Sequence, residues 1–267
     1  MLYKRVISSL LFLPIFYLVT WRLSPVYFTA LVLIAVAVGQ NEFYRMARAR
    51  GINPNAVLGS VIGALVVLES YHPLLPGMGK TYLAAGLLLI MIVRMISPRP
   101  VDGAFEDIAA TFTGIFYVAV LFSFQIAILT GTDGRRWIVF LYFVIWASDI
   151  GAYSIGIPFG EHRLHEKISP KKSIEGLIGA LAASAGMALL CRVWFMPPVG
   201  LGDVETIVLG LLLAVVGTLG DLTESLFKRA VGVKDSGGII PGHGGILDRM
   251  DSIMFAAPVL YYYLRMR

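Results

Sequence analysis

Residues 225–251, SLFKRAVGVKDSGGIIPGHGGILDRMD, concentrate ionisable side chains and glycines between two apolar stretches. Charged side chains at the edge of a bilayer are costly unless they bind a partner, and glycines let a ligand approach the backbone closely. Carboxylates without Cys or His companions favour a hard cation, and Mg²⁺ is the usual one where phosphates react. The segment therefore predicts a loop that binds metal and phosphate and is held by membrane helices.

Further polar residues follow the apolar run VLGLLLAVVGTLG that precedes this loop. Asp221, Glu224, Ser225 and Lys228 are spaced i, i+3, i+4 and i+7, so they share one face of a helix that leaves the membrane. The alternative is a solvated helix end in which an Asp and a Lys pair. Because Asp221 directly follows the apolar run, we favour a functional role, with Asp221 and Glu224 as metal ligands.

Three more acids are candidates for the same chemistry. Asp149 lies inside the apolar run FLYFVIWASDIGAYSIGIPF, where an unpaired carboxylate is expensive. It binds metal or substrate, or it makes a structural contact between helices. Asp248 and Asp251 flank Arg249 just before SIMFAAPVLYYYL. Their alternative is a place in the N-terminal turn of the last helix, which explains Asp251 better than Asp248.

The PGHGG motif at 241–245 offers successive backbone N–H groups that can cradle a phosphate. Alone it is weak, because such sequences are usually only turns and His243 would more often be structural. It is not a P-loop, since GxxxxGK[ST] is absent. Nearby basic side chains supply the positive charge that a nucleotide triphosphate needs, namely Lys228, Arg229, Lys234 and Arg249.

A second polar segment, ISPKKSIEG at 168–176, lies where an apolar stretch begins. Its lysines and hydroxyls could hold a lipid phosphate at the depth of the headgroups. The alternative has Ser173 capping the following helix with Glu175 in its first turn, while Lys171 and Lys172 only follow the positive-inside rule.

The elements that position these residues are membrane helices. The chain has 267 residues, of which 57% are hydrophobic and 15% charged, and its mean hydropathy is +0.78. These values predict an all-α, polytopic helical bundle that forms a single membrane domain over 1–267, with the motif-bearing half at about 140–267. About nine spans are expected, at roughly 6–21, 25–40, 56–71, 82–97, 108–130, 137–158, 174–193, 205–223 and 252–265.

Charge sets the expected orientation. Most Lys and Arg residues fall on the side of the N-terminus, which predicts N-in and C-out and puts 159–173 and 224–251 in the cytoplasm. The net charge of +5 serves topology and anionic lipids, so nucleic acid is not an expected partner. The single cysteine, Cys191, excludes an intramolecular disulfide.

Residues 225–251 resemble the signature of the phosphatidate cytidylyltransferases, or CDP-diacylglycerol synthases. The matching residues are Ser225, Lys228, Arg229, Lys234, Asp235, Pro241, His243, Gly244, Gly245, Asp248, Arg249 and Asp251. Gly220, Asp221, Glu224, the Asp149 span and SPKKSIEG also look like family features, so specific motifs cover about the last 125 residues. Upstream of residue 140 the resemblance rests on hydropathy alone.

The resemblance implies Mg²⁺-dependent transfer of CMP from CTP to phosphatidic acid in the inner membrane of a bacterium. We expect Asp221 and Asp248 to be the principal ligands of one or two Mg²⁺ ions, assisted by Asp149 or Glu224. The triphosphate would be held by Lys228, Arg229, Lys234, Asp235, His243, Gly244, Gly245 and Arg249. The lipid phosphate would be held by Ser169, Lys171, Lys172 and Ser173. The family also makes a homodimer an expectation.

Two other classes of function are compatible with parts of the sequence. A CTP-dependent lipid kinase of the polyprenol or phytol type shares the nucleotide and metal needs but transfers the γ-phosphoryl group. A cation- or proton-coupled transporter would line a pathway with Asp149, Asp221 and Glu224. Its acids should spread along several spans, whereas here they cluster beside a basic, glycine-rich loop. A non-catalytic scaffold is the least favoured reading.

Overall fold

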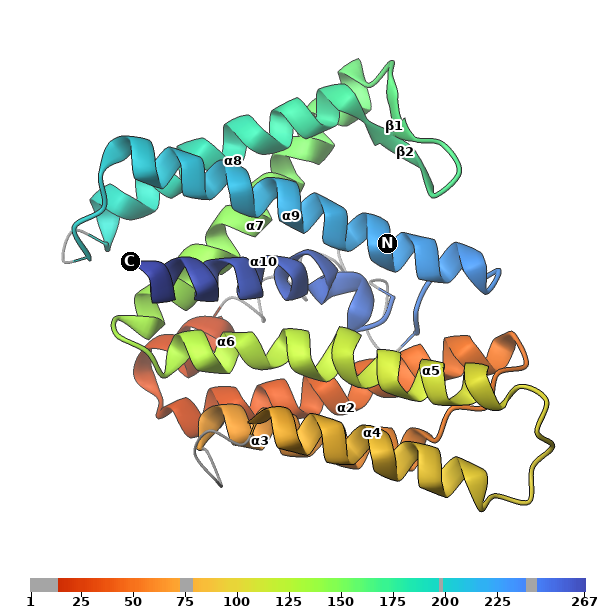
Figure 1. Ribbon diagram of the computed structural model, residues 1–267. Coiled ribbons are helices and arrows are strands. Elements are labelled where there is room, and N and C mark those ends of the chain that lie inside the picture. Colours follow the sequence, from red (N-terminus) through yellow and green to blue (C-terminus); the bar gives the residue numbers. More distant parts are fainter. Residues whose placement is uncertain (1–13, 73–78, 197–198, 239–243) are drawn as a thin grey trace. The chain divides into compact units, whose positions relative to one another are not determined.

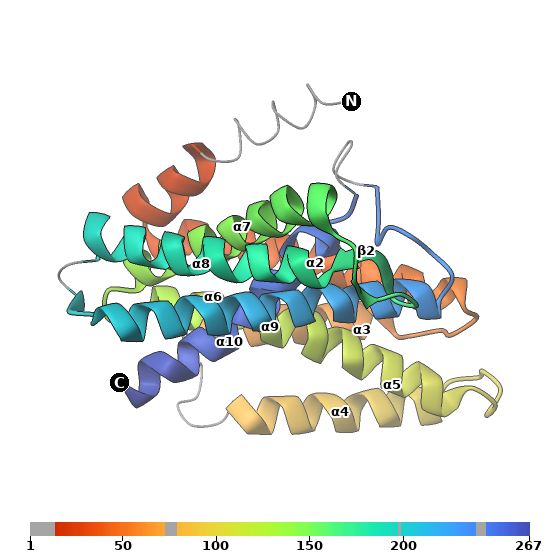
Figure 2. The same cartoon turned by 90° about the horizontal axis from the view of Figure 1, so that it is seen from above.

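The computed structural model describes residues 14–72, 79–196, 199–238 and 244–267, and these are mostly helical (Figures 1 and 2). The elements are η1 (Leu18–Arg22), α2 (Pro25–Ala49), α3 (Ala56–Tyr71), α4 (Gly79–Met95), α5 (Ala104–Gly114), η2 (Ile115–Val120), α6 (Leu121–Leu129), α7 (Gly134–Phe159), β1 (Arg163–His165), β2 (Ser169–Ser173), α8 (Ile174–Trp194), α9 (Asp203–Ala230) and α10 (Leu247–Met266).

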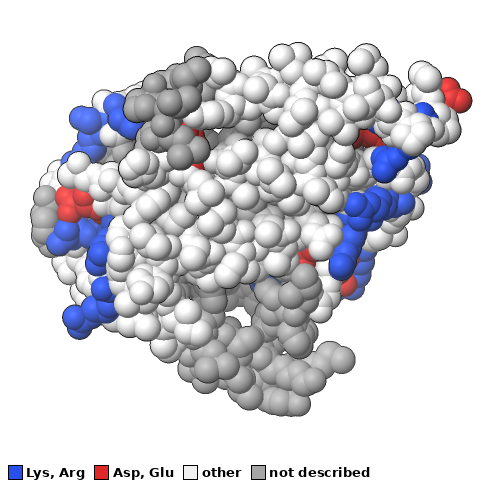
Figure 3. Space-filling model, turned by 90° about the horizontal axis from the view of Figure 1, so that it is seen from below, with Lys and Arg blue, Asp and Glu red and all other residues white. Residues whose placement is uncertain are grey.

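The prediction of an all-α membrane-type protein is confirmed. Five helical stretches are long and apolar enough to cross a membrane, namely Pro25–Ala49, Ala104–Leu129, Gly134–Phe159, Ile174–Trp194 and Asp203–Ala230. Two shorter apolar helices cover Ala56–Tyr71 and Thr81–Met95. Figure 3 shows one face on which most side chains are neither acidic nor basic. The count of nine and the orientation stay predictions, and most of the first expected span lies outside the described residues.

The chain divides into two compact units, which are described separately. The first comprises Met1–Thr130 with Ala230–Arg249, and the second comprises Gly131–Arg229 with Met250–Arg267. The prediction of one membrane domain over 1–267 stays a prediction.

In the first unit, α2 supplies the polar contacts that join the helices. Gln40 donates from Nε2 to the carbonyl of Gly59 at 3.1 Å, and the Tyr44 hydroxyl donates to the carbonyl of Thr111 at 3.0 Å. A Cβ at Gly59 would lie 2.1 Å from Tyr44 Oη, and one at Gly114 would lie 2.3 Å from Tyr44 Cε1. The two glycines therefore make room for a large side chain that bonds into α5.

The helix that contains the second expected span continues beyond residue 40, because α2 ends at Ala49. Several polar side chains follow residue 40 in this helix. The structure satisfies them inside the protein: Gln40, Glu42 and Tyr44 are all buried and hydrogen-bonded to other segments. The helix therefore continues to Ala49 through residues that hydropathy alone did not assign to the expected span.

In the second unit, glycines bring helices into backbone contact. A Cβ at Gly151 would lie 2.4 Å from the carbonyl oxygen of Gly179, so α7 and α8 pack closely through small residues. A Cβ at Gly220 would lie 2.5 Å from the carbonyl oxygen of Asp251, so α9 and α10 touch beside Asp221.

The expected loop at 159–173 contains an antiparallel hairpin. Strand β1 pairs with β2 in a register that joins Arg163 to Ser173 and His165 to Ser169. Each strand is too short to show a clear alternation in the sequence. The hairpin fixes SPKKS as a strand that leads directly into α8.

Candidate active site

The hairpin and α9 meet through an ion pair in the second unit. Lys172 Nζ lies 2.7 Å from Asp221 Oδ2, and the side chains are 23% and 36% exposed, respectively. The sequence assigned Lys172 to a lipid phosphate and Asp221 to a metal ion. The structure brings a group suited to an anion and a group suited to a cation into direct contact.

The polar face expected on α9 is a continuous helical face. Ser225 Oγ donates to Asp221 Oδ1 at 3.4 Å, one turn apart. Lys228 pairs with Glu224, and both residues are buried. The helix continues to Ala230, so the alternative of a freely solvated helix end is wrong for Glu224 and Lys228. The role of Lys228 at the triphosphate stays a prediction, and the structure already gives its ammonium a carboxylate partner.

Arg229, at the end of α9, also contacts the hairpin. Its Nε atom donates to the carbonyl oxygen of Ile168 at 3.4 Å. Together with the pair between Lys172 and Asp221, this bond ties the SPKKS segment to the last turns of α9. Two motifs that are far apart in the sequence therefore form one cluster.

Asp251, which the metal assignment did not include, lies among the acidic candidates of the second unit. It lies in α10, outside the five candidate membrane spans, and is 8% exposed. Burial raises the pKa of its carboxyl well above the usual range, and the negative charges of Asp221, Glu224 and Asp149 raise it further. Four acids of the second unit thus interact electrostatically. The signal was present in the signature, whose final Asp is Asp251.

The last helix begins several residues before the apolar run SIMFAAPVLYYYL. Helix α10 begins at Leu247, so Asp248 occupies its first turn and Asp251 the second. The helix-dipole explanation therefore suits Asp248 better than Asp251, the reverse of the expectation. The glycine-rich turn is therefore followed almost directly by α10, which begins at Leu247.

In the first unit, Asp248 organises the segment before α10. Its Oδ2 atom accepts hydrogen bonds from Ser236 N at 3.0 Å, Ser236 Oγ at 2.8 Å and Gly245 N at 2.8 Å. A Cβ at Gly244, where φ is +79°, would lie 2.6 Å from the same oxygen. Both the turn and the close approach therefore require glycine at 244.

Glu42 of α2 reaches the same segment and was not expected from the sequence. It is 1% exposed and accepts from Ile246 N on Oε1 and from Leu247 N on Oε2, both at 3.1 Å. Ser236 Oγ lies 3.4 Å from Oε2. The only signal in the sequence was a carboxylate just past an apolar stretch.

The other expected nucleotide-binding residues vary in their surroundings. Lys234, Asp235 and Arg249 are exposed, and Gly245 is buried against Ser236 and Glu42. His243 lies outside the described residues. Their roles with the triphosphate stay predictions.

The residues of the hairpin that are expected to hold the lipid phosphate differ in their exposure to solvent. Lys171 is exposed and Ser169 half-buried, so both are accessible to a ligand. Ser173 is 3% exposed, and its Oγ accepts from Gly176 N at 3.1 Å, so the expected helix cap is confirmed. Because Ser173 is buried and its Oγ already accepts this hydrogen bond, the structure gives no support to Ser173 as a lipid-phosphate ligand.

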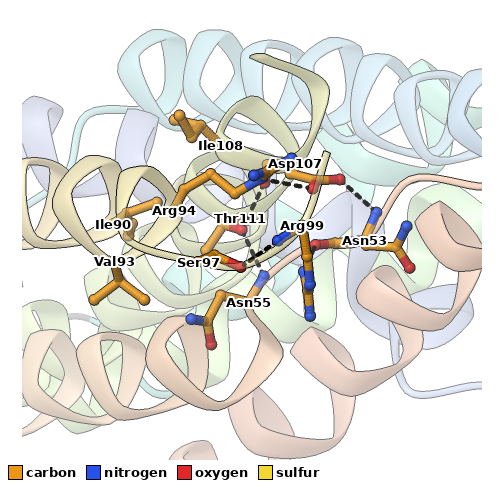
Figure 4. A pocket seen from close by; sticks show the side chains of 10 residues that line it. All are labelled: Asn53, Asn55, Ile90, Val93, Arg94, Ser97, Arg99, Asp107, Ile108 and Thr111. Atoms are coloured by element: carbon orange, nitrogen blue, oxygen red, sulfur yellow. Dashed lines mark hydrogen bonds and ion pairs between the residues drawn. The ribbon is translucent and has the colours of Figure 1, made fainter. Parts of the chain in front are cut away.

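A separate cavity in the first unit carries polar and apolar walls (Figure 4). Arg94 Nε bonds to Asp107 Oδ2 at 3.0 Å, and Asn53 N donates to Asp107 Oδ1 at 2.6 Å. Arg99 donates to the carbonyl of Asn53 at 2.9 Å. These bonds hold the segment after α2 against α4 and α5. The polar groups that line the cavity therefore have a structural role.

Within the described ranges, no three His, Cys, Asp or Glu side chains converge closely enough to hold a metal ion by themselves. Mg²⁺ usually needs only one or two carboxylates, because water and substrate phosphates complete its coordination. The acids and lysines of the second unit are therefore suited to a metal–phosphate complex rather than to a metal held by protein alone.

A comparison with known proteins covers nearly the whole chain. Residues 3–267 match the model of the cytidylyltransferase family. The chain belongs to the cytidylyltransferase family. The match covers both compact units except for residues 1 and 2.

Individual relatives of this cytidylyltransferase-family protein carry one name. A phosphatidate cytidylyltransferase of Synechocystis is 34% identical over 266 residues, with 89% of this chain and 88% of the relative covered. One of Bacillus subtilis is 31% identical over 240 residues, with the same shares covered. One of Staphylococcus saprophyticus is 41% identical over 181 residues, covering 68% of this chain and 67% of the relative.

Proposed function

We propose that this protein is a phosphatidate cytidylyltransferase, which transfers CMP from CTP to phosphatidate and releases pyrophosphate. The product is CDP-diacylglycerol, an intermediate in phospholipid synthesis. Membership of the cytidylyltransferase family and the names of its relatives support this assignment. The intact signature at 225–251 supports it as well.

The observation that carries the proposal is the contact of Lys172 Nζ with Asp221 Oδ2 at 2.7 Å. A reaction between a lipid phosphate and a nucleotide needs an anion-binding group next to a cation-binding group. Lys172 of β2 and Asp221 of α9 provide that pair. A lysine ammonium beside a carboxylate is also a stand-in for the positive charge of a metal ion.

We assign Mg²⁺ to the carboxylates. Asp221 and Asp248 are the principal ligands in this proposal, and Asp149, Glu224 or Asp251 assists. The buried carboxyl of Asp251, which the charges of Asp221, Glu224 and Asp149 repel, fits a site that gains a cation. When bound, Mg²⁺ would neutralise charge on the phosphates.

The chain's own residues then perform positioning and charge neutralisation. A phosphatidate oxygen attacks the α-phosphorus of CTP, a new P–O bond forms, and the P–O bond to the β-phosphate breaks with its electrons leaving on pyrophosphate. Ser169, Lys171 and Lys172 orient the lipid phosphate. Arg229, Lys234, Arg249 and the backbone at Gly244 and Gly245 hold the triphosphate. No general base is needed, because a phosphate monoester is already ionised at neutral pH.

We also propose a cellular location for the reaction. Phosphatidate is a membrane lipid and CTP is soluble, so the reaction belongs at the cytoplasmic face of a bacterial inner membrane. The five apolar helices support a membrane location. A homodimer remains an expectation from the family resemblance.

The decisive experiment uses purified protein, phosphatidate and CTP labelled at the α-phosphate. We expect labelled CDP-lipid, and no product when a chelator removes divalent cations. Label confined to CDP and CTP, with the γ-phosphate transferred to lipid, would establish a lipid kinase instead. Ion flux in liposomes that Asp248→Asn abolishes, without any CTP turnover, would establish a transporter.

A further inference from the structure

Glu42 contacts two parts of residues 225–251 that several residues separate in the sequence. On one side, Ser236 Oγ lies 3.4 Å from Glu42 Oε2. On the other side, Ile246 N and Leu247 N donate to Oε1 and Oε2, respectively, at 3.1 Å. One carboxylate therefore contacts both ends of the glycine-rich segment.

The backbone on both sides is shaped to fit this carboxylate. A Cβ at Gly237 would lie 2.5 Å from Glu42 Oε1, and one at Gly245 would lie 2.5 Å from Oε2. Any larger residue at these two positions would displace the Glu42 side chain. The fit explains Gly245 of the signature, and Gly237 of the same segment, by a side chain outside the signature.

The same contacts cap a helix. Ile246 N and Leu247 N belong to the beginning of α10, where backbone N–H groups have no acceptor within the helix. A negative charge at this place is also stabilised by the helix dipole. In the part of the chain that the structure describes, no ion pair to Glu42 is found, so these N–H groups are what holds a buried charge.

Asp248 is fixed through the same network. Ser236 Oγ lies 2.8 Å from Asp248 Oδ2 and stands between the two carboxylates. Gly245 N, beside the Glu42 carboxylate, donates to Asp248 Oδ2 at 2.8 Å. A change at Glu42 therefore reaches Asp248 through Ser236 and through the backbone at 245.

We infer that Glu42 is a positioning residue that clasps residues 236–237 and 245–247 and thereby sets the Asp248 carboxylate and the Gly244–Gly245 backbone for nucleotide and metal. The inference rests on the proposed function for the identity of the ligand. The clasp itself does not depend on that function.

The test compares Glu42→Gln with wild type and with Glu106→Gln, an exposed glutamate of the same unit. In Glu42→Gln an NH₂ donor replaces one of the two carboxylate oxygens, so the backbone N–H that faced this oxygen loses its acceptor. We expect hydrogen exchange in a peptide covering 244–250 to rise about tenfold or more in Glu42→Gln. Exchange in α3 should match wild type, and Glu106→Gln should change neither.

Steady-state kinetics supply the second readout. We expect Glu42→Gln to raise the KM for CTP about tenfold while the KM for phosphatidate stays unchanged. Glu42→Asp keeps the charge but is shorter by one methylene, so its KM for CTP should lie between the two. Ser236→Ala should shift the KM for CTP in the same direction by less.

The outcomes separate a positioning role from a merely structural one. Unchanged exchange at 244–250, or faster exchange throughout the protein, overturns the inference. So does a lower kcat with both KM values unchanged, since that reflects fewer folded molecules. Should Glu42→Gln fail to fold, Glu42→Asp and Ser236→Ala decide by the same criteria. If wild type makes no CDP-lipid, the proposed function fails, and the exchange data still decide on the clasp.

Discussion

Lys172 Nζ lies 2.7 Å from Asp221 Oδ2, and both side chains remain partly exposed. The Lys172 Nζ atom itself is buried, whereas the Asp221 side chain is 36% exposed. In the proposed reaction the lysine would exchange this partner for a phosphate, and the aspartate would exchange it for a metal ion. Without a ligand, the ion pair holds the ammonium and the carboxylate next to each other.

The first prediction concerns this pair. Asp221→Asn should lower kcat/KM at least about 100-fold, because it removes charge that stabilises the reacting phosphates. Lys172→Met should lower it about tenfold, mainly by raising the KM for phosphatidate. Lys167→Met, in the exposed turn of the same hairpin, is the control and should behave as wild type. Equal effects of Lys167→Met and Lys172→Met would contradict a specific role for Lys172.

The second prediction concerns Asp251. Asn has nearly the same shape as Asp, but it carries no charge among Asp221, Glu224 and Asp149. Asp251→Asn should therefore match or exceed the melting temperature of wild type in detergent, while its activity falls about tenfold or more. Thermal unfolding and the labelled-CTP assay measure the two effects. A variant that melts earlier and keeps its activity would show that the carboxylate is structural.

The third prediction concerns close packing of α9 and α10. Gly220→Ala would place a methyl group 2.5 Å from the carbonyl oxygen of Asp251, so the helices must separate. We expect a loss of about 1–3 kcal/mol in the free energy of unfolding and a loss of activity, because Asp221 adjoins this contact. Gly186→Ala in α8 meets nothing within 4 Å and should be neutral or slightly stabilising. Similar melting temperatures for the two variants would refute the packing argument.

The fourth prediction uses metal and nucleotide as stabilising ligands. Chelation should abolish activity, and Mg²⁺ should restore it. At about 100 times the dissociation constant, Mg²⁺ with CTP should stabilise the protein by about 2.7 kcal/mol, seen as a higher melting temperature. Asp221→Asn should lose most of this increase. A full increase in that variant would exclude Asp221 from the metal site.

The fifth prediction separates the cavity near α4 from the reaction. Arg94 and Asp107 are 10% and 8% exposed, so Asp107→Ala leaves a buried guanidinium without its carboxylate. The expected cost is about 3–5 kcal/mol in the free energy of unfolding. Both KM values of the folded enzyme should stay unchanged, and Asp102→Ala in the exposed preceding loop should melt like wild type. A shift in either KM would connect this cavity to catalysis.

Local patterns in the sequence determined the class of fold and part of the site. Long apolar stretches indicated membrane helices, and i, i+3, i+4, i+7 spacing placed Asp221, Glu224, Ser225 and Lys228 on one face of α9. Ser173 was identified as a helix cap because capping depends on residues only a few positions apart. The motifs of residues 225–251 indicated the family for the same reason: their spacing is local.

Only the tertiary structure decided which distant residues meet. Lys172 pairs with Asp221 from a hairpin that hydropathy did not reveal, and Asp251 joins acids of two other helices. Glu42 contacts a segment about 200 positions away, which no periodicity encodes. These contacts depend on how closely helices pack, and in α9 and α10 that distance is set by the missing side chain of Gly220. The sequence determines which groups can react or bind, whereas packing determines which of them share a charge or a hydrogen bond.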